Sequence, residues 1–419
     1  MHNAVPDTAE QQPHVQVLVA EKLYAPEEIL GPVAVVLEGT TIRDIWRGTD
    51  AASARSRLHS QMPNSTVEVT DLGSMSLAPG YIDIHTHGFY GHDMTTGSQK
   101  DVEDMARELP QTGVTSFFPT IATLGRAETV QQVRRVVGAA ENQLHRSAEI
   151  LGMRLEGPFI CFAKKGAQYG PGIRPPDPVE MEELVEAGRG WVRIVDYAPE
   201  EDKDDRLLAT LVRLGILACI GHTSATYEQA LKAIDGGVRH STHLFNAMSS
   251  LEHREPGVPG ALLTDRRVTV EIIADGIHVH PVLMKLAIAA RGIQNIALIT
   301  DAMEAAGLPA GEYDFVGRKV MVREGAVRLE NGALAGSILT FDRAVRNIVA
   351  FTGLEWSDAI AMATHVPARI AGVAHRKGRV APGADADLVA LDNDGRVQCT
   401  WVHGHLAYQN ASDEDKGPR

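Results

Sequence analysis

A short apolar run near residue 80 carries two histidines that are two positions apart. The run "YIDIHTH" covers residues 81 to 87 and contains His85 and His87. Residues i and i+2 of a β-strand point to the same side, so both imidazoles can face one site. Other apolar runs also end in side chains that can bind a metal: Glu156, His222, His243 and Asp301.

Imidazole and carboxylate groups are suitable ligands for zinc, iron and other divalent transition metals. A single histidine at a strand end is more often a hydrogen-bonded core or rim residue. Six such side chains at equivalent strand ends are hard to explain by packing, because each buried polar group then needs its own partner. The pattern predicts a divalent metal site with one or two ions, zinc first and iron, manganese or cobalt as alternatives.

The elements that would position these residues form a repeating pattern. Between residues 78 and 375, strand-like runs alternate with helical stretches, which indicates parallel β/α units. Eight such units predict an α/β fold of the TIM-like (β/α)8 type, with the site at the C-terminal ends of the strands. An open, doubly wound sheet is the alternative, but no GxGxxG motif follows the first run. The eight runs cover residues 81–87, 115–120, 152–159, 191–199, 217–223, 239–246, 268–276 and 296–302.

Both ends of the chain differ in sequence pattern from residues 78–375, because they contain short β-branched runs broken by glycine and proline. We expect them to pair into one small, discontinuous β-sandwich domain. The predicted boundaries are residues 14–77 and 376–410 for the two parts of this domain and 78–375 for the barrel. The final residues, "NASDEDKGPR", are expected to form a frayed tail.

Charge and composition narrow the class of partner. The chain has 419 residues, with 40 Lys and Arg against 54 Asp and Glu, giving a net charge of −14. This charge argues against nucleic acid or an anionic membrane as partner, and an anionic substrate would need a local basic pocket. Three cysteines without a CxxC pair, together with the lack of a leader-like or membrane-length apolar run, lead us to expect a cytoplasmic protein.

A set of motifs carries a resemblance to a known family. In chain order they are "PGYIDIHTHG", "LEGPF", "GHTSA", "THLFNAM", "HREPG", "ADGIHV" and "ITDAM". Together they resemble the amidohydrolase superfamily and, within it, the deacetylases of N-acetylglucosamine 6-phosphate. An HxH pair alone is a sign of the superfamily only, whereas "LEGPF" with "THLFNAM" and "HREPG" is much narrower. The likeness runs from about residue 77 to residue 380.

The resemblance implies roles for the predicted metal ligands. Glu156, His222 and His243 would hold one ion, while His85, His87 and Asp301 would hold a second, with Glu156 as the bridge. Asp301 would also take a proton from the attacking water and hand it to the departing amine. His278, in "ADGIHV", would donate a hydrogen bond to the developing oxyanion. The simpler alternatives are that Asp301 only binds metal and that His278 only makes a rim hydrogen bond.

Phosphate recognition is expected after the sixth run. The backbone N–H groups of Asn246 and Ala247 and the guanidinium of Arg254 suit phosphate oxygens. The resemblance implies that Arg254 reaches the site of a neighbouring subunit, so that the protein is a homodimer. The alternative is a surface arginine paired with Glu252 or Glu255.

The sugar is expected to contact two further segments. Ala167 and Gln168 come first, followed by a lid with Leu334, Ala335 and Gly336. Gln168 stands where relatives place a histidine, and a glutamine cannot become cationic. The resemblance implies deacetylation of N-acetyl-D-glucosamine 6-phosphate. The glutamine at position 168 makes the galacto epimer an alternative substrate. An unphosphorylated N-acyl amino acid, a cyclic amide or a non-catalytic scaffold are the more distant alternatives.

Overall fold

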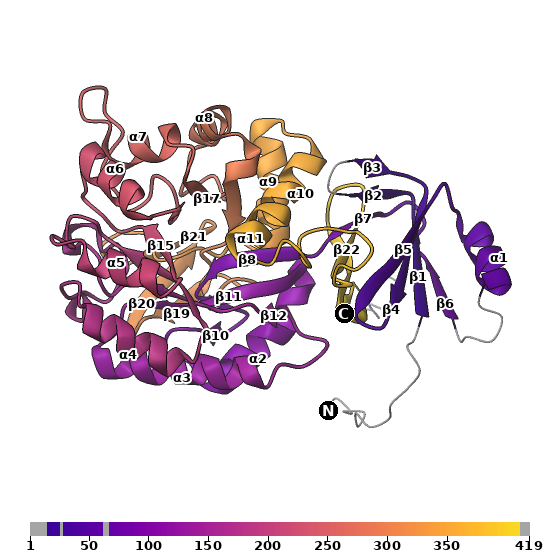
Figure 1. The fold of residues 1–419 in the computed structure, drawn as a ribbon, viewed down its shortest axis with the longest axis horizontal. Helices are drawn as coiled ribbons and strands as arrows, with labels where there is room; N and C mark the ends of the chain where they lie inside the picture. The colour runs from indigo at the N-terminus through magenta and orange to yellow at the C-terminus, as the bar shows by residue number, and fades with distance from the viewer. Residues whose placement is uncertain (1–14, 26–27, 62–66, 411–419) are drawn as a thin grey trace.

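A barrel of eight parallel strands forms the core of the larger part of the computed structural model, on the left in Figure 1. The structure describes residues 15–25, 28–61 and 67–410. Each predicted run overlaps one of the barrel strands, which confirms the predicted fold class. The strands follow one another around the sheet in chain order, which excludes the doubly wound alternative. They are β8 (Tyr81–Thr86), β11 (Val114–Ala122), β13 (Met153–Glu156), β14 (Val192–Tyr197), β15 (Leu217–Ile220), β16 (His240–Ser241), β17 (Thr269–Ile273) and β18 (Ile296–Ile299).

Backbone hydrogen bonds bring the last strand of the barrel next to the first. The N–H of Asp301 donates to the carbonyl of His85 at 2.9 Å, and the N–H of His87 donates to the carbonyl of Ala302 at 2.8 Å. These bonds lie at the C-terminal ends of β8 and β18. They therefore place three of the predicted metal ligands beside one another through the main chain alone.

Helices surround the barrel strands (Figure 1). Helix α9 shows why: Phe341, Ala344, Val345 and Ile348 are buried at the spacing that gives a helix one apolar face. The barrel helices are α2 (Gln99–Glu108), α3 (Arg126–Glu141), α4 (Pro178–Gly188), α5 (Arg206–Arg213), α6 (Tyr227–Gly236), α7 (Gly257–Thr264), α8 (Pro281–Arg291), α9 (Phe341–Thr352), α10 (Trp356–Ala363) and α11 (His365–Ile370). Short 3-10 turns are η1 (Leu109–Thr112), η2 (Phe162–Lys164), η3 (Gly170–Gly172) and η4 (Ile293–Asn295).

The chain ends form two further sheets, and strands from both ends meet in one of them, as predicted. One has the strand order β5-β4-β1-β6 and the other β24-β23-β22-β7-β2-β3, so that β7 pairs with β22 from the opposite end. Leu18 and Leu37 of the first sheet share a buried cluster with Leu77 and Leu388 of the second. The strands are β1 (Val15–Ala20), β2 (Lys22–Tyr24), β3 (Ile29–Leu30), β4 (Val33–Glu38), β5 (Thr41–Arg47), β6 (Val67–Asp71), β7 (Ser76–Pro79), β22 (Leu388–Leu391), β23 (Val397–Val402) and β24 (His405–Gln409), with α1 (Ala51–Gln61) between β5 and β6.

The domain boundaries stay a prediction. All but the first residue of the expected frayed tail, residues 411–419, lies outside the described residues. One sheet was not expected: β19 (Gly311–Phe315), β20 (Arg318–Arg323) and β21 (Ala326–Leu329) form an antiparallel sheet between β18 and α9. Three short strands complete the fold: β9 (Gly88–Phe89), β10 (His92–Asp93) and β12 (Glu149–Ile150).

Cys161, Cys219 and Cys399 are all buried and free. Within the described ranges, no helix is both long and apolar enough to cross a membrane.

A buried lysine joins the barrel to the C-terminal segment. The ammonium of Lys377 lies 2.7 Å from Glu149 and 3.0 Å from Asp385, and it also contacts Asp387. The lysine side chain is only 1% exposed. Burial by itself lowers the pKa of Lys377, but the three carboxylates raise it above its usual value, so the side chain stays charged.

We predict that Lys377→Met strongly destabilises the protein, because it removes the buried cation among three carboxylates. Glu149 and Asp385 keep their ion pairs with Arg376, whereas Asp387 loses the cation that it contacts. The expected cost is about 3–5 kcal/mol of unfolding free energy. The matched control is Lys319→Met, which removes an exposed lysine that also pairs with two carboxylates, Glu312 and Asp314. Urea unfolding of the metal-free proteins measures both. Equal midpoints for the two variants would contradict the assigned role of Lys377.

Candidate metal centre

A cavity of about 310 Å³ opens where the barrel strands end. The structure brings most of the predicted site residues to its wall. His85 lies beneath the wall and is fully buried, whereas Ala335 and Arg254 are not part of the lining. The predicted residues that line it are His87, Glu156, Ala167, Gln168, His222, His243, Asn246, Ala247, His278, Asp301, Leu334 and Gly336.

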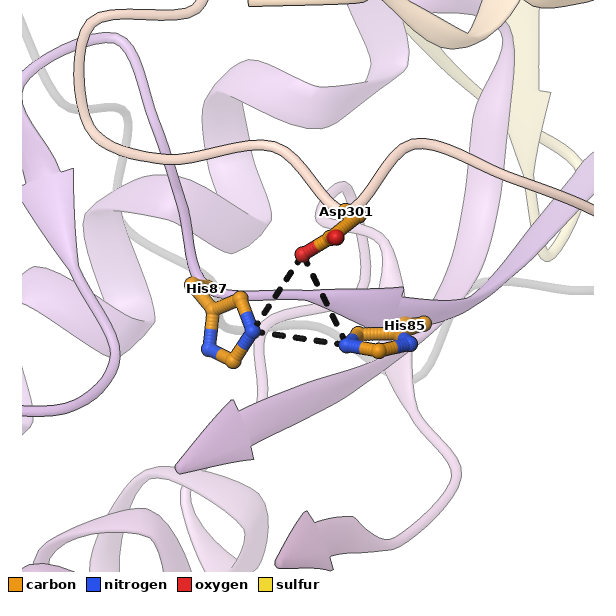
Figure 2. A group of neighbouring side chains, drawn as sticks. All are labelled: His85, His87 and Asp301. Atoms are coloured by element: carbon orange, nitrogen blue, oxygen red, sulfur yellow. Dashed lines mark hydrogen bonds and ion pairs between the residues drawn. The ribbon is translucent and has the colours of Figure 1, made fainter. Parts of the chain in front are cut away.

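His85, His87 and Asp301 form the first group of candidate ligands, shown in Figure 2. The two Nε2 atoms of the histidines are 3.3 Å apart. Oδ1 of Asp301 lies 3.4 Å from Nε2 of His87 and 3.6 Å from Nε2 of His85. The two rings come from the end of β8, and the carboxylate comes from the chain after β18 (Figure 2). Three donor atoms therefore converge on one point.

Glu156, His222 and His243 form the second group. Oε1 of Glu156 lies 2.9 Å from Nε2 of His222 and 3.1 Å from Nε2 of His243. Its other oxygen, Oε2, lies 2.9 Å from Nε2 of His87 in the first group. The two oxygens of one carboxylate thus face different groups, which is the arrangement that a bridging ligand requires.

Hydrogen bonds to Nδ1 settle which nitrogen faces the centre in three of the four ligand histidines, whereas Nδ1 of His243 is buried without a hydrogen-bond partner among the described residues. Nδ1 of His87 lies 3.0 Å from a backbone carbonyl, and Nδ1 of His222 lies 2.8 Å from another. Nδ1 of His85 lies 3.1 Å from the carboxylate of Glu271. Because carbonyl and carboxylate oxygens only accept, these Nδ1 atoms carry the protons, and the Nε2 lone pairs are free to bind. Buried lone pairs and carboxylates that face one another fit a divalent cation.

The backbone after three strands has an unusual conformation that aims the ligands. His222, His243 and Asp301 each lie two residues beyond the last residue of their strand, Ile220, Ser241 and Ile299. Their φ angles are 47°, 25° and 47°. Positive φ is uncommon for residues other than glycine and is concentrated at functional sites. The sequence had predicted these residues within extended runs, so this part of the prediction is wrong.

His278 and Gln168 have fixed orientations. Nδ1 of His278 donates to the carboxylate of Asp275 at 2.6 Å, which leaves Nε2 for the cavity. Burial lowers the pKa of His278, but Asp275 outweighs it and raises the pKa. The amide oxygen of Gln168 accepts from the N–H of Thr123 at 2.7 Å, so its NH2 group faces Glu156. The sugar contact of Gln168 stays a prediction.

Two predicted substrate residues lie elsewhere. Ala335 is fully buried, and its N–H donates to the carbonyl of Val327 at 3.1 Å. Arg254 is exposed in the segment before α7, outside the cavity of its own chain. Within residues 67–410 it forms no ion pair with Glu252 or Glu255, which argues against the simple surface alternative.

Sequence reasoning missed several residues of the site. Asp275 anchors His278, and the only signal was its position in "ADGIHV". Phe315 of the unexpected sheet lines the cavity and packs edge-on against His87, with ring centroids 5.8 Å apart. Glu271 accepts from Nδ1 of His85, but in the sequence it is a single glutamate within a strand-like run and gave no signal of this contact.

Parallel barrel strands with buried histidine and carboxylate groups at their ends define a hydrolase of the metal-dependent barrel class. The Amidohydrolase family model matches residues 76–407, and this chain belongs to that family. It is 38% identical over 384 residues to the N-acetylglucosamine-6-phosphate deacetylase of Bacillus subtilis (strain 168), covering 91% of this chain and 97% of the relative. It is also 38% identical over 341 residues to the N-acetylgalactosamine-6-phosphate deacetylase of Escherichia coli O157:H7. That match covers 81% of this chain and 90% of the relative.

Among solved structures, this chain is similar to the N-acetyl-D-glucosamine-6-phosphate deacetylase of Mycobacterium smegmatis in complex with N-acetyl-D-glucosamine-6-phosphate. The TM-score is 0.86 at 32% identity, covering 94% of this chain and 99% of that one. The whole architecture is therefore shared, including the sheets formed by the chain ends.

We predict that metal binding strengthens as pH rises. Burial alone lowers the pKa of His87, but the Glu156 and Asp301 carboxylates raise it to about 9 in the metal-free protein. Only the neutral imidazole binds metal, so a proton must leave below that pH. Between pH 6 and 8 the logarithm of the apparent affinity should rise by at least about one per pH unit. Calorimetric titration of chelator-treated protein measures this, and a flat profile would contradict it.

Proposed function

We propose that this protein hydrolyses the N-acetyl group of N-acetyl-D-glucosamine 6-phosphate to give D-glucosamine 6-phosphate and acetate, a reaction of amino-sugar catabolism. The observation that carries the proposal is the convergence of Glu156, His222 and His243 at the wall of one cavity, in a chain similar to deacetylases over most of its length. The cavity volume, about 310 Å³, lies in the range of small-molecule sites.

Glu156, His222 and His243 would hold one divalent ion, and His85, His87 and Asp301 would hold a second. When bound, such an ion lowers the pKa of water to about 7 and polarises an acyl oxygen. We propose zinc, with iron, manganese or cobalt as alternatives, because imidazole and carboxylate accept all four.

Asp301 is the proposed general base and acid. Its buried carboxylate lines the cavity, and burial raises its pKa, but the neighbouring histidines lower it below the usual value, so it is ionised and able to accept a proton. It takes a proton from the attacking water and returns it to the amine nitrogen, since an amine anion is a poor leaving group. Asp275 orients His278 and, outweighing burial, raises its pKa, which favours the imidazolium with a proton on both ring nitrogens. Nε2 then donates to the acyl oxygen as negative charge develops there.

The phosphate would bind at the rim of the cavity, where Asn246 and Ala247 belong to the wall. Lys164 is the one lysine or arginine among the lining residues. We propose that the guanidinium of Arg254 from a second copy donates hydrogen bonds to the phosphate oxygens, since Arg254 is exposed and lies outside the cavity of its own chain. The protein then acts as a homodimer, and the three free cysteines fit a cytoplasmic location.

The galacto epimer is a second candidate substrate. One relative at 38% identity is an N-acetylgalactosamine-6-phosphate deacetylase, and Gln168 replaces the histidine expected beside the sugar. Both epimers carry the same acetyl and phosphate groups, so the metal centre does not distinguish them.

An acetate-release assay with N-acetylated sugars, with and without a 6-phosphate, tests the substrate class on the metal-loaded protein. We expect activity only on the phosphorylated sugars. Arg254→Ala should lower kcat/KM for them by about 10–100-fold, the worth of a charge-assisted hydrogen bond. The control is Arg267→Ala, which removes an exposed arginine paired with Asp235 and Asp265 and should leave kcat/KM unchanged. Reaction of unphosphorylated compounds alone would refute the substrate assignment.

We predict that Asp301→Asn lowers kcat by about 10²–10⁴-fold, because the amide keeps the shape and cannot accept a proton. Asp342→Asn, an aspartate of α9 paired with Arg346, serves as the matched control. Metal content is measured in parallel, so that loss of an ion is distinguished from loss of the base. A variant that keeps its metal and more than a third of its activity would contradict the assigned role.

Mixing the two impaired variants extends this test to the dimer. A hybrid of Asp301→Asn and Arg254→Ala chains contains one site with an intact Asp301 and an intact Arg254 from its partner. Recovered activity in the mixture is expected if Arg254 acts across the interface. No recovery after verified subunit exchange would refute that part of the proposal.

A further inference from the structure

A second buried polar layer lies beneath the candidate metal ligands. Arg154 comes two residues before Glu156 on β13, so both side chains face the barrel interior. The Arg154 guanidinium binds Asp196 of β14 through Nε at 3.0 Å and Nη2 at 2.9 Å. It also contacts Glu271 of β17. The side chains of these three residues are fully buried, so the charges are paired inside the protein and not with water.

Both oxygens of Glu271 are fully occupied. Oε2 accepts from Nδ1 of His85 at 3.1 Å and from the backbone N–H of His243 at 3.0 Å. Oε1 accepts from Nε2 of His240 at 2.9 Å and from Arg154. Nδ1 of His240 in turn hydrogen-bonds to a threonine hydroxyl at 2.7 Å. Glu271 therefore has no free lone pair with which to bind a metal ion itself.

One carboxylate thus touches a member of each ligand group. His85 belongs to the group with His87 and Asp301, and His243 belongs to the group with Glu156. The contact to His85 fixes the ring with Nε2 toward the centre. The contact to His243 holds the main chain at a residue with a φ of 25°, a conformation that needs support from its surroundings.

We infer that Glu271, held in place by Arg154, is a positioning residue that sets the tautomer of His85 and the backbone of His243 for metal binding. This inference rests on the proposed function only in that the site binds a divalent ion. Arg154 makes the arrangement stable, because a buried carboxylate without a cationic partner is costly. Asp196 completes the bidentate hold on Arg154 and keeps the guanidinium beneath Glu156.

The test is a zinc titration of the metal-free, full-length protein in competition with a chromogenic chelator. Glu271→Gln keeps the size of the side chain and removes its charge. We expect its zinc affinity to fall by about 10–100-fold, as for other residues that orient metal-binding histidines. The matched control is Glu180→Gln, which alters another Arg–Glu pair away from the cavity, between the buried Glu180 and the partly buried Arg174. Its affinity should stay within twofold of the wild type.

Wild-type zinc affinity in folded Glu271→Gln, or an equal loss in Glu180→Gln, would overturn the inference. If Glu271→Gln does not fold, Glu271→Asp replaces it, because this variant keeps the charge against Arg154 and shortens the reach to His85. Unchanged affinity in Glu271→Asp would likewise overturn the inference. Since ion binding is measured and not deacetylation, a chain that binds zinc as described but acts on another amide refutes the proposed function alone. A wild-type chain that binds no divalent ion refutes both.

Discussion

Imidazole lone pairs and two carboxylates face one another in a buried cluster at the wall of one cavity, and the rest of the site depends on this constraint. The two oxygens of Glu156 join the two ligand groups, one toward His222 and His243 and the other toward His87. Such a set repels itself unless a cation lies among the donors or protons occupy them. Divalent ions in the two ligand groups would satisfy these donors, and that requirement links the buried charges to the hydrolytic chemistry.

The barrel supplies the geometry that this constraint needs. Eight strands end at one rim, so residues far apart in the chain meet there. The rim itself is irregular, because three of the ligands follow their strands with positive φ. Hydrogen bonds compensate for this backbone strain: the N–H of Asp301 binds the carbonyl of His85, and the carbonyl of Asp301 accepts from Ser337 at 2.7 Å. The same main-chain hydrogen bonds that support the strained backbone therefore also hold the metal ligands in place.

The sequence predicted the elements and most of the site because their signals are local. The two-residue spacing of His85 and His87, the alternation of strand and helix runs, and the motifs around the ligands could all be read along the chain. The Glu271 layer could not, since a glutamate in "VTVEII" becomes informative only when Arg154 and His85 lie against it in space. The left-handed backbone and the sheet that carries Phe315 also depend on tertiary contacts, for which local propensity gives no signal.

The central claim is that Glu156, His222 and His243 bind one ion together. Anomalous X-ray diffraction at the zinc absorption edge, from crystals of zinc-loaded protein, tests it most directly. The account predicts a strong peak at about 2.0–2.2 Å from a Glu156 oxygen and from Nε2 of both histidines. Loaded crystals with no peak at this position, or with these side chains turned to separate partners, would contradict it.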